Sequence, residues 1–273
     1  MSVFIIVLHF GDPGVTKDCI KSILDAGVNF TEIIVVDNNQ NFVYKKKEIT
    51  TLKNKKNLGF AGGVNVGIKY AMTKKADYIL LLNNDTSIKR NFLKTLVEFA
   101  EQTENAGIIG PAIKFKKDSK VTYDIGGKIN NVFGRTSHFE VNKIVKKSAR
   151  IVDYISGCCM LIKTDVLKKI GFFDERFFLY YEDVDFCLRA RRKNFLTYVL
   201  PEVSVEHALS KTVGKISPLA VYHQTQSAIR FGKKYYKKNT VLNLAFILIQ
   251  SLNIFRKNPK VGSFAFLAIY KNL

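Results

Sequence analysis

Apolar runs alternate with helical patterns through the first third of the chain. Residues 3–8, 33–37 and 78–82 are nearly continuous apolar runs, which is typical of strands covered on both faces. Apolar positions with helical spacing fall between them, at residues 16–26 and 62–73. This order predicts βαβ units, and therefore an α/β fold with a mainly parallel central sheet flanked by helices.

The pattern is less even after residue 90. Residues 90–102 carry apolar side chains at spacings of three and four, which predicts a helix that covers the sheet with one face. From 111 to 150 the pattern weakens around lysine pairs and a Gly126-Gly127 turn, and this indicates a variable insertion of short β-like pieces.

Regular patterns return after residue 152. Residues 153–162 predict a strand, and Thr164 is the expected N-cap of the next helix because its hydroxyl can accept a backbone N–H. Residues 182–192 predict a further helix, and residues 196–200 predict a further strand.

Length and charge divide the chain in two. With 273 residues and a hydrophobic fraction of 47%, it can form one sizeable α/β domain plus an appendage. The formal net charge is +20, but after Glu206 there are eleven Lys and Arg and no Asp or Glu. We therefore expect an α/β domain over residues 1–210 and a basic, amphipathic helical tail over residues 211–273.

The cysteines and the N-terminus indicate a reducing cytoplasm. Cys19, Cys158, Cys159 and Cys187 show no CxxC spacing and lie within predicted helices or strands, so neither a zinc site nor a disulfide framework is expected. The apolar start has no basic region before it and ends abruptly at Gly11-Asp12-Pro13, which favours a first strand over a signal peptide.

Polar groups stand at strand ends and helix starts, where open parallel sheets bind ligands. They are Asp37-Asn38-Asn39, the glycine-rich residues 57–63, Asn83-Asn84-Asp85 and the acidic residues 182–185. The glycines let backbone N–H groups approach an anion at a helix N-terminus. They fit neither GxGxxG nor the P-loop, which argues against a dehydrogenase or an ATPase, and a tight loop for helix packing is the structural alternative.

Two of these groups carry carboxylates suited to chemistry. Asn83-Asn84-Asp85 offers oxygen ligands for a divalent cation bridging to a diphosphate, although such a group is often only a turn or a cap. The carboxylates of residues 182–185 follow an aromatic run at 177–181, so one acid in a partly desolvated site could act as a base. Acidic residues in a first helical turn also simply favour the helix dipole.

Taken in order, these strings resemble glycosyltransferase family 2, particularly its bacterial rhamnosyltransferase-like members with the GT-A fold. The resembling strings span residues 3–210 and include VVDNN, NLGFAGGVNVG, LLLNNDT, the block from ISGCCM to YYEDVDFCLR, and VEHALS. The resemblance implies a GT-A fold with a C-terminal basic helical extension. It also implies an inverting, metal-dependent transferase that uses a nucleotide diphosphate sugar.

The resemblance also assigns roles by position. Asp85 and His207 would hold Mn²⁺ or Mg²⁺, and Asn83 is neutral where the family's DxD motif commonly has an aspartate. The donor-binding residues would be Asp37, Asn39, Asn57, Gly59, Gly63, Asn65, Asn83 and Asn84. Asp183 matches the family's catalytic aspartate and would deprotonate the acceptor hydroxyl. Candidates on the acceptor side are Tyr181, Glu182 and Asp185, and the two acids could instead cap the helix. Asp174 has both a functional and a structural interpretation.

The tail contains two apolar-rich segments, 241–255 and 261–270, each too short or too polar to span a bilayer. With their flanking lysines they are typical of helices that lie on an anionic membrane surface, which would place the protein at the inner face of the plasma membrane. Packing against the catalytic domain is the alternative. Nucleic acid is not an expected partner, because no recognised nucleic-acid module accompanies the basic residues.

Two other functions remain possible at this point. A sugar nucleotidylyltransferase would need a glycine-rich basic loop straight after the first strand, where residues 8–13 offer little of that kind. A noncatalytic glycan- or lipid-binding module is disfavoured by the presence of both Asp85 and Asp183. The expected donor is a dTDP- or UDP-linked rhamnose or hexose, and the expected acceptor is a glycan or lipid-linked glycan for cell-surface polysaccharide.

Overall fold

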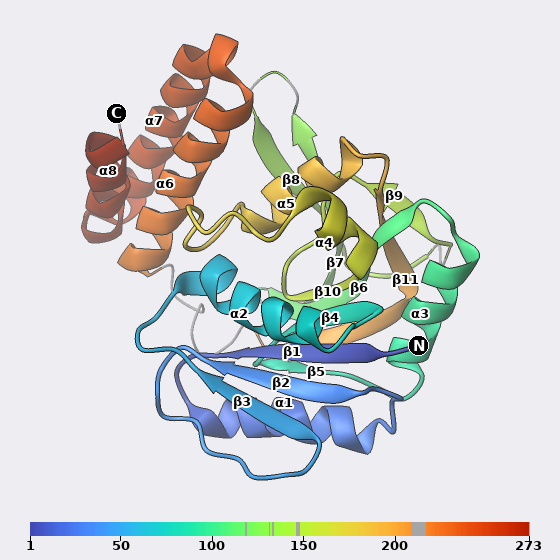
Figure 1. The fold of residues 1–273 in the computed structure, drawn as a ribbon. Helices are drawn as coiled ribbons and strands as arrows, with labels where there is room; N and C mark the ends of the chain where they lie inside the picture. Colours follow the sequence, from blue (N-terminus) through green and yellow to red (C-terminus); the bar gives the residue numbers. More distant parts are fainter. Residues whose placement is uncertain (118, 131, 133, 146–147, 209–216, 273) are drawn as a thin grey trace.

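The computed structural model describes residues 1–117, 119–130, 132, 134–145, 148–208 and 217–272. The chain forms one mixed sheet with helices on both faces and a helical group at the C-terminus (Figure 1). Its strands are β1 (Val3–His9), β2 (Glu32–Asp37), β3 (Ile49–Lys53), β4 (Tyr78–Asn83), β5 (Thr86–Ser87), β6 (Ala106–Lys117), β7 (Lys120–Asn130), β8 (Arg135–Val141), β9 (Arg150–Val152), β10 (Cys159–Lys163) and β11 (Leu196–His207). Its helices are α1 (Pro13–Asp25), α2 (Gly59–Thr73), α3 (Phe92–Gln102), α4 (Thr164–Ile170), α5 (Glu182–Arg191), α6 (Pro218–Tyr235), α7 (Thr240–Lys257) and α8 (Pro259–Asn272), with a 3-10 turn, η1, at Lys237–Asn239.

The N-terminal half is the predicted parallel sheet. Strands β3, β2, β1 and β4 pair in that order, all in parallel. Alternate side chains of β1 enter different cores, with Ile6 facing α2 and Ile5 facing α1 and α3. Because both faces are covered, these strands are apolar throughout, and each fully buried Ile or Val contributes about 1.5–3 kcal/mol.

Helix α2 packs closely on the sheet through glycines. A Cβ on Gly63 would lie 2.4 Å from Leu8 Cδ1, and a Cβ on Gly67 would lie 2.8 Å from Ile6 Cγ2. The four-residue spacing of these glycines puts them on one helix face. The helix therefore begins directly above the carboxyl ends of β1 and β2.

The second half of the sheet is antiparallel in part. Strand β10 runs antiparallel to both β4 and β6, while β11 runs parallel to β6. Residues 111–150, expected to be a weakly patterned insertion, contain long antiparallel strands: β6 pairs with β7, and β7 with β8. The sequence pattern did not reveal them, because β8 has only half-buried and exposed positions and therefore no continuous apolar face.

Two local predictions were wrong. The strand expected at 153–162 begins only at Cys159, because the backbone before it turns to bond other elements: Cys158 O accepts from Asn83 N at 2.8 Å. Thr164 is not an N-cap either. It is the first residue of α4, and its hydroxyl donates to Asp77 O at 3.1 Å.

Helices α6, α7 and α8 form a group beside the sheet domain (Figure 1). Helix α6 lies within the helical tail predicted over residues 211–273, and it starts at Pro218 with Ser217 Oγ accepting from Ala220 N at 3.1 Å. The apolar segments of the tail are helical, as predicted, in α7 and α8. The expected boundary between residues 210 and 211 lies outside the described residues. Within the described part of the chain, every helix falls short of the length and apolarity that crossing a bilayer requires.

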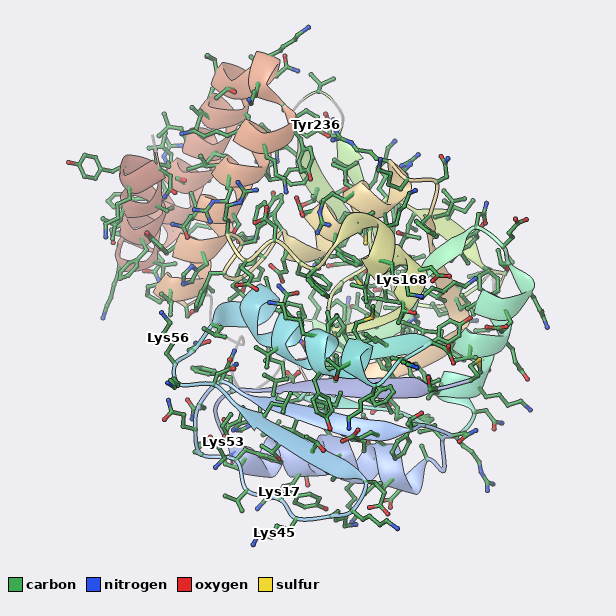
Figure 2. All side chains as sticks on the ribbon, viewed as in Figure 1. Lys17, Lys45, Lys53, Lys56, Lys168 and Tyr236 are labelled. Atoms are coloured by element: carbon green, nitrogen blue, oxygen red, sulfur yellow. The ribbon has the colours of Figure 1, made fainter. Side chains whose placement is uncertain are left out.

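Lysines surround the free edge of the sheet. Strand β3 is the outermost strand on that side, and Lys53 is exposed at its end. Figure 2 shows Lys45 and Lys56 on the loops that flank this strand. Positive side chains at an edge oppose pairing with the edge of another molecule.

The contact between α2 and the sheet can be tested by filling it. Gly67→Leu should destabilise the protein by about 3 kcal/mol, since the new side chain would overlap Ile6 and Val36. Urea unfolding of the full chain measures the change. The matched control is Lys69→Leu on the exposed side of the same helix, which should stay within about 0.5 kcal/mol of wild type. Equal losses in the two variants would contradict the packing described above.

Candidate active site

The polar groups that follow β2 and β4 lie at the same edge of the sheet. In the parallel register His9 lies opposite Asp37, and Leu8 lies opposite Asn83, so the carboxyl ends of β2, β1 and β4 are neighbours. A chain of side-chain bonds crosses this edge. His9 Nδ1 lies 2.6 Å from Thr16 Oγ1, which also accepts from Asn84 Nδ2 at 2.9 Å.

Asp37 is fully buried and shapes the loop that follows β2. Its Oδ1 accepts from Asn39 N at 2.9 Å, and its Oδ2 accepts from Phe42 N at 3.0 Å. The carboxylate therefore fixes the backbone of residues 38–42, while the side chain of Asn39 is exposed at the surface of this loop.

The start of α2 is held by asparagines. Asn57 Oδ1 accepts from Gly59 N at 2.9 Å, and Asn38 Nδ2 donates to Gly59 O at 2.9 Å. Gly59 has a φ of 73°, and a Cβ there would lie 2.2 Å from Phe178 O, so only glycine fits. Asn65 lies nearly two turns further along, and its side-chain amide bonds the backbone of Phe173 through both nitrogen and oxygen: Nδ2 donates to Phe173 O and Oδ1 accepts from Phe173 N. These contacts attach α2 to residues 173–178.

Asp85 and His207 are brought together, although they are far apart along the chain. Residue His207, at the end of β11, pairs with Thr86 of β5, and its Nε2 lies 2.9 Å from Asp85 Oδ1. The backbone of Asp85 accepts from Ala208 N at 2.9 Å. Both side chains retain some exposure, 24% for Asp85 and 13% for His207.

A carboxylate beside an imidazole suits a divalent cation of the Mn²⁺ type. In the part of the chain that the structure describes, no group of three or more His, Cys, Asp or Glu could hold a metal ion. The pair therefore offers two protein ligands, and a bound cation would complete its shell with other oxygens, such as those of a diphosphate and water. The residues present fit a cation that is shared with a substrate.

Asp183 sits at the N-terminus of α5, facing the loop before β10. Its Oδ2 accepts from Gly157 N at 3.0 Å, and its Oδ1 accepts from Val184 N at 2.8 Å. Residue 157 adjoins Cys158, whose carbonyl bonds Asn83 N. Asp183 is therefore linked, through two adjacent residues, to the end of β4 that carries Asn83 and Asp85.

Glu182, which is buried, and Asp183, which is half-buried, form an acidic pair with unequal surroundings. Burial, and then the charge of Asp183, hold the pKa of Glu182 well above its ordinary value. Burial also raises the pKa of Asp183, but the N–H groups of Gly157 and Val184 and the charge of His138 oppose that rise. Oε2 of Glu182 has no hydrogen-bond partner among the described residues. The backbone N–H groups therefore favour the ionised form of Asp183 over that of Glu182.

The residues just before α5 adopt an unusual backbone conformation. Tyr180 and Tyr181 both have left-handed φ values, 67° and 66°, and Tyr181 is the N-cap position of α5. Such residues cost of order 1–3 kcal/mol each and are found where surrounding contacts enforce them, often at active sites. Here the turn delivers Glu182 and Asp183 to the sheet edge.

Asp185 lies on the side of α5 opposite to Asp183. It is fully buried, and its carboxylate accepts from Arg189 Nε at 2.8 Å and Tyr235 Oη at 2.7 Å. Lys234 bridges it to Asp174, which also pairs with Arg176. Asp174 and Asp185 thus join α5 to α6 in this structure.

Sequence reasoning missed a histidine–aspartate pair near Asp183. His138 Nδ1 on β8 lies 2.8 Å from Asp124 Oδ2 on β7, and the His138 ring meets Tyr154 edge-on. Burial lowers the pKa of His138, but the hydrogen bond and charge of Asp124 outweigh it, so the net shift is upward. No motif marks these residues, because only the β7–β8 pairing brings them together.

The comparisons of the sequence with known proteins agree on one family. The profile described as Glycosyl transferase family 2 matches residues 4–171. The chain is 28% identical over 215 residues to the dTDP-rhamnosyl transferase RfbF of Shigella flexneri, covering 74% of this chain and 71% of the relative. It is 28% identical over 184 residues to the low-salt glycan biosynthesis hexosyltransferase Agl10 of Haloferax volcanii, covering 66% of this chain and 59% of that relative.

Among solved structures, the fold is similar to the mannosyltransferase PcManGT of Pyrobaculum calidifontis, determined in complex with GDP-Man and Mn²⁺. The TM-score is 0.60 at 12% identity, over 99% of this chain and 86% of that one. At this identity the likeness concerns the fold, which is the GT-A glycosyltransferase fold predicted from the sequence.

The unequal acidic pair predicts a pH-dependent stability. A carboxyl whose pKa is raised by folding stabilises the protein below its unfolded pKa, and this contribution is lost as pH rises through the folded pKa. The free energy of unfolding of Glu182→Gln should therefore match that of wild type near pH 4. At pH 8 it should exceed that of wild type by about 1–3 kcal/mol, because folded wild type must then either bury the charge of Glu182 or keep its carboxyl protonated. Urea unfolding at both pH values measures this.

Glu98→Gln on α3 is the matched control, since Glu98 is exposed and lies 3.7 Å from Lys94. It should change stability little at either pH. If Glu182→Gln changes the free energy of unfolding at pH 8 as little as this control does, burial does not raise the pKa of Glu182.

Proposed function

The chain belongs to glycosyl transferase family 2, and on this premise we propose that it moves rhamnose or another hexose from a nucleotide diphosphate to an acceptor hydroxyl, inverting the anomeric carbon. The arrangement of Asp183 is the single observation that carries the mechanism. A half-buried carboxylate with a raised pKa, held by two backbone N–H groups, is suited to take a proton from an attacking hydroxyl.

In this proposal Asp183 is the base and Glu182 stays neutral beside it. The acceptor hydroxyl gives its proton to Asp183 as its oxygen attacks the anomeric carbon from the face opposite the nucleotide diphosphate. The charge of His138, which lowers the pKa of Asp183, keeps the base ionised without a direct bond to it. Tyr181 and Glu182 remain our candidates for contact with the acceptor.

Asp85 and His207 would hold Mn²⁺ or Mg²⁺ against the diphosphate of the donor. When bound, the cation would stabilise the negative charge that builds up on the departing nucleotide. The observation in support is the 2.9 Å approach of His207 Nε2 to Asp85 Oδ1 at the edge of the sheet. The mannosyltransferase of similar fold was determined with Mn²⁺.

The donor nucleotide would lie between the β2 end and the start of α2. Asp37 would act through the loop it shapes, and Asn39 and Asn57 are exposed there. The remaining donor-site candidates are Gly59, Gly63, Asn65, Asn83 and Asn84. A relative named as a dTDP-rhamnosyl transferase supports dTDP-rhamnose as donor, with UDP-hexoses as the other class.

We propose that residues 1–210 form the catalytic unit, and that the tail of 211–273 holds it at the inner face of a membrane that carries a lipid-linked glycan acceptor. Helix α7 exposes one apolar face, with Leu248, Ile249 and Leu252 each at least 42% exposed. Arg256 and Lys257 are exposed at its end. An apolar face bordered by cations fits the interface of an anionic leaflet.

The assignment of the base is tested by Asp183→Asn. The amide cannot accept the proton, so kcat should fall about 10²–10⁴-fold, while stabilisation by UDP or dTDP with Mn²⁺ is retained. Product formation with a panel of nucleotide sugars and thermal shift measure the two effects. Wild-type activity should rise with pH through a pKa above the ordinary range of an aspartate, since the base must be ionised.

Asp18→Asn on the exposed side of α1 is the control and should leave both readouts unchanged. Normal turnover by Asp183→Asn would remove Asp183 from its role as the base.

The membrane proposal is tested by flotation with vesicles. Wild type should float with phosphatidylglycerol vesicles, less so as salt increases, because each cation contributes about 1 kcal/mol near an anionic surface. The double variant Ile249→Asp and Leu252→Asp should bind at least about tenfold more weakly, as it loses two apolar side chains from the interface. Val43→Asp, an exposed position on the β2–β3 loop, is the control. Equal flotation of both variants would contradict a role for α7.

A further inference from the structure

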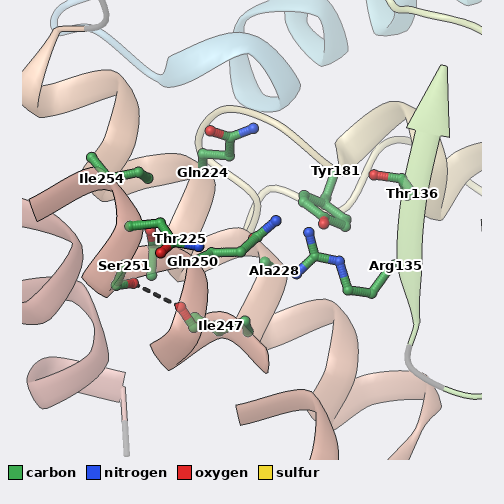
Figure 3. A pocket seen from close by; sticks show the side chains of 11 residues that line it. Arg135, Thr136, Tyr181, Gln224, Thr225, Ala228, Ile247, Gln250, Ser251 and Ile254 are labelled. Carbon is green, nitrogen blue, oxygen red and sulfur yellow. Dashed lines mark hydrogen bonds between the residues drawn. The ribbon is translucent and has the colours of Figure 1, made fainter. Parts of the chain in front are cut away.

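A cavity of about 340 Å³ lies between β8, α6 and α7. Its lining is mostly polar, with Gln224 and Thr225 from α6 and Gln250 and Ser251 from α7. None of the described residues that line it is acidic. Figure 3 shows the side chains of Arg135 and Gln250 extending toward each other across it. The cavity thus presents donors to any molecule that enters.

Arg135 is the charged group of this cavity, and it has no counter-ion among the described residues. Its guanidinium lies 3.8 Å from the centre of the Phe246 ring on α7, and no described carboxylate forms an ion pair with it. Burial lowers the pKa of Arg135, yet an arginine stays charged in proteins. A half-buried cation without an anion is costly unless a ligand supplies one.

The cavity adjoins the proposed base. Tyr181 lines it and stands two residues before Asp183 at the start of α5. Thr136 lines it as well, and His138, two residues further along β8, is the group whose charge lowers the pKa of Asp183. Burial raises the pKa of Tyr181, and the charge of Asp183 adds to this rise, so the proposed base lies close to this wall of the cavity.

The chemistry of the lining distinguishes between ligands. A planar guanidinium binds phosphate with two parallel N–H···O bonds, and amide and hydroxyl donors complete such a site. Helix α7 contributes to the cavity from one face and carries the exposed apolar side chains of Leu248, Ile249 and Leu252 on another. A phosphate that carries an apolar chain fits a donor-lined cavity beside a helix whose other side would face a membrane.

We propose that this cavity binds the phosphate of a lipid-linked acceptor, with Arg135 as its counter-ion and the lipid chain lying along α7. The proposal rests on the proposed function, since it concerns the acceptor of the same transfer reaction. It assigns specificity to residues outside the donor site: the acceptor is recognised by its phosphate, and its sugar then reaches Asp183.

The test is calorimetric binding to the full chain in EDTA, which removes binding of diphosphate through a cation. The probes are geranyl diphosphate, geraniol and inorganic pyrophosphate. Wild type should bind geranyl diphosphate more tightly than either of the other probes. Arg135→Gln should weaken its binding about tenfold or more, and Arg135→Lys, which keeps the charge but loses the planar fork, should fall in between.

Two further variants make the result specific. Arg150→Gln removes the same charge from an arginine that also lies over an aromatic ring, 5.4 Å from the centre of Phe139, but outside the cavity, and should bind like wild type. Gln250→Leu changes an exposed residue of α7 that faces Arg135, so folding is preserved, and should weaken binding several-fold.

Unchanged binding in both Arg135→Gln and Gln250→Leu would overturn the proposal. Pyrophosphate binding as tight as that of geranyl diphosphate would overturn its lipid part, because the ligand would then be a free phosphate compound. Asp183→Asn should bind geranyl diphosphate like wild type. The binding measurement therefore tests the phosphate site alone, and the assignment of Asp183 as the base is tested separately by product formation.

Discussion

The hydrogen bond from Gly157 N–H to Asp183 Oδ2 is the contact on which the site depends. It joins the N-terminus of α5 to the loop before β10, and the neighbouring carbonyl of Cys158 bonds the end of β4. Two segments that are distant in the chain thereby share one edge of the sheet, with Asp85 and His207 on one side and Asp183 on the other. Gly157 is needed there, because a Cβ would lie 2.9 Å from the ring of Phe60. The acidic pair then acquires its unequal surroundings, since both oxygens of Asp183 accept backbone N–H groups, whereas Oε2 of Glu182 has no partner among the described residues.

Much of the fold and of the site could be predicted from the sequence where the signal is local. Continuous apolar runs gave β1, β2 and β4, and the resemblance placed Asp85, His207 and Asp183 in one family pattern. What could not be predicted depends on pairing between distant residues. His138 meets Asp124 only through the β7–β8 register, and Lys234 meets Asp185 across 49 residues. Helix α6 falls within the predicted helical tail and carries a start signal in Ser217-Pro218, but its bounds were not predicted, because polar residues that line a cavity interrupt its apolar stripe.

The two ligand sites that we propose differ in construction. The proposed donor side is built from backbone groups positioned by asparagines and glycines, as at Asn57 and Gly59, and is stiff because Gly59 has no space for a side chain. The proposed acceptor side is built from side chains of β8, α6 and α7, which include an arginine that forms no ion pair with the described residues. A fold can keep backbone groups of this kind constant while the side chains on the acceptor side vary. This is a physical reason why acceptors are harder to infer from motifs than donors.

The buried network around Asp185 has a practical consequence. Lys234 and Tyr235 come from α6, so shortening the chain to its first 210 residues would remove both and leave Asp185 with Arg189 alone. Asp174 would lose Lys234 in the same step and keep only Arg176. The helical tail is therefore not a detachable appendage, and a truncated fragment would report on a weakened α5 as much as on a missing membrane contact.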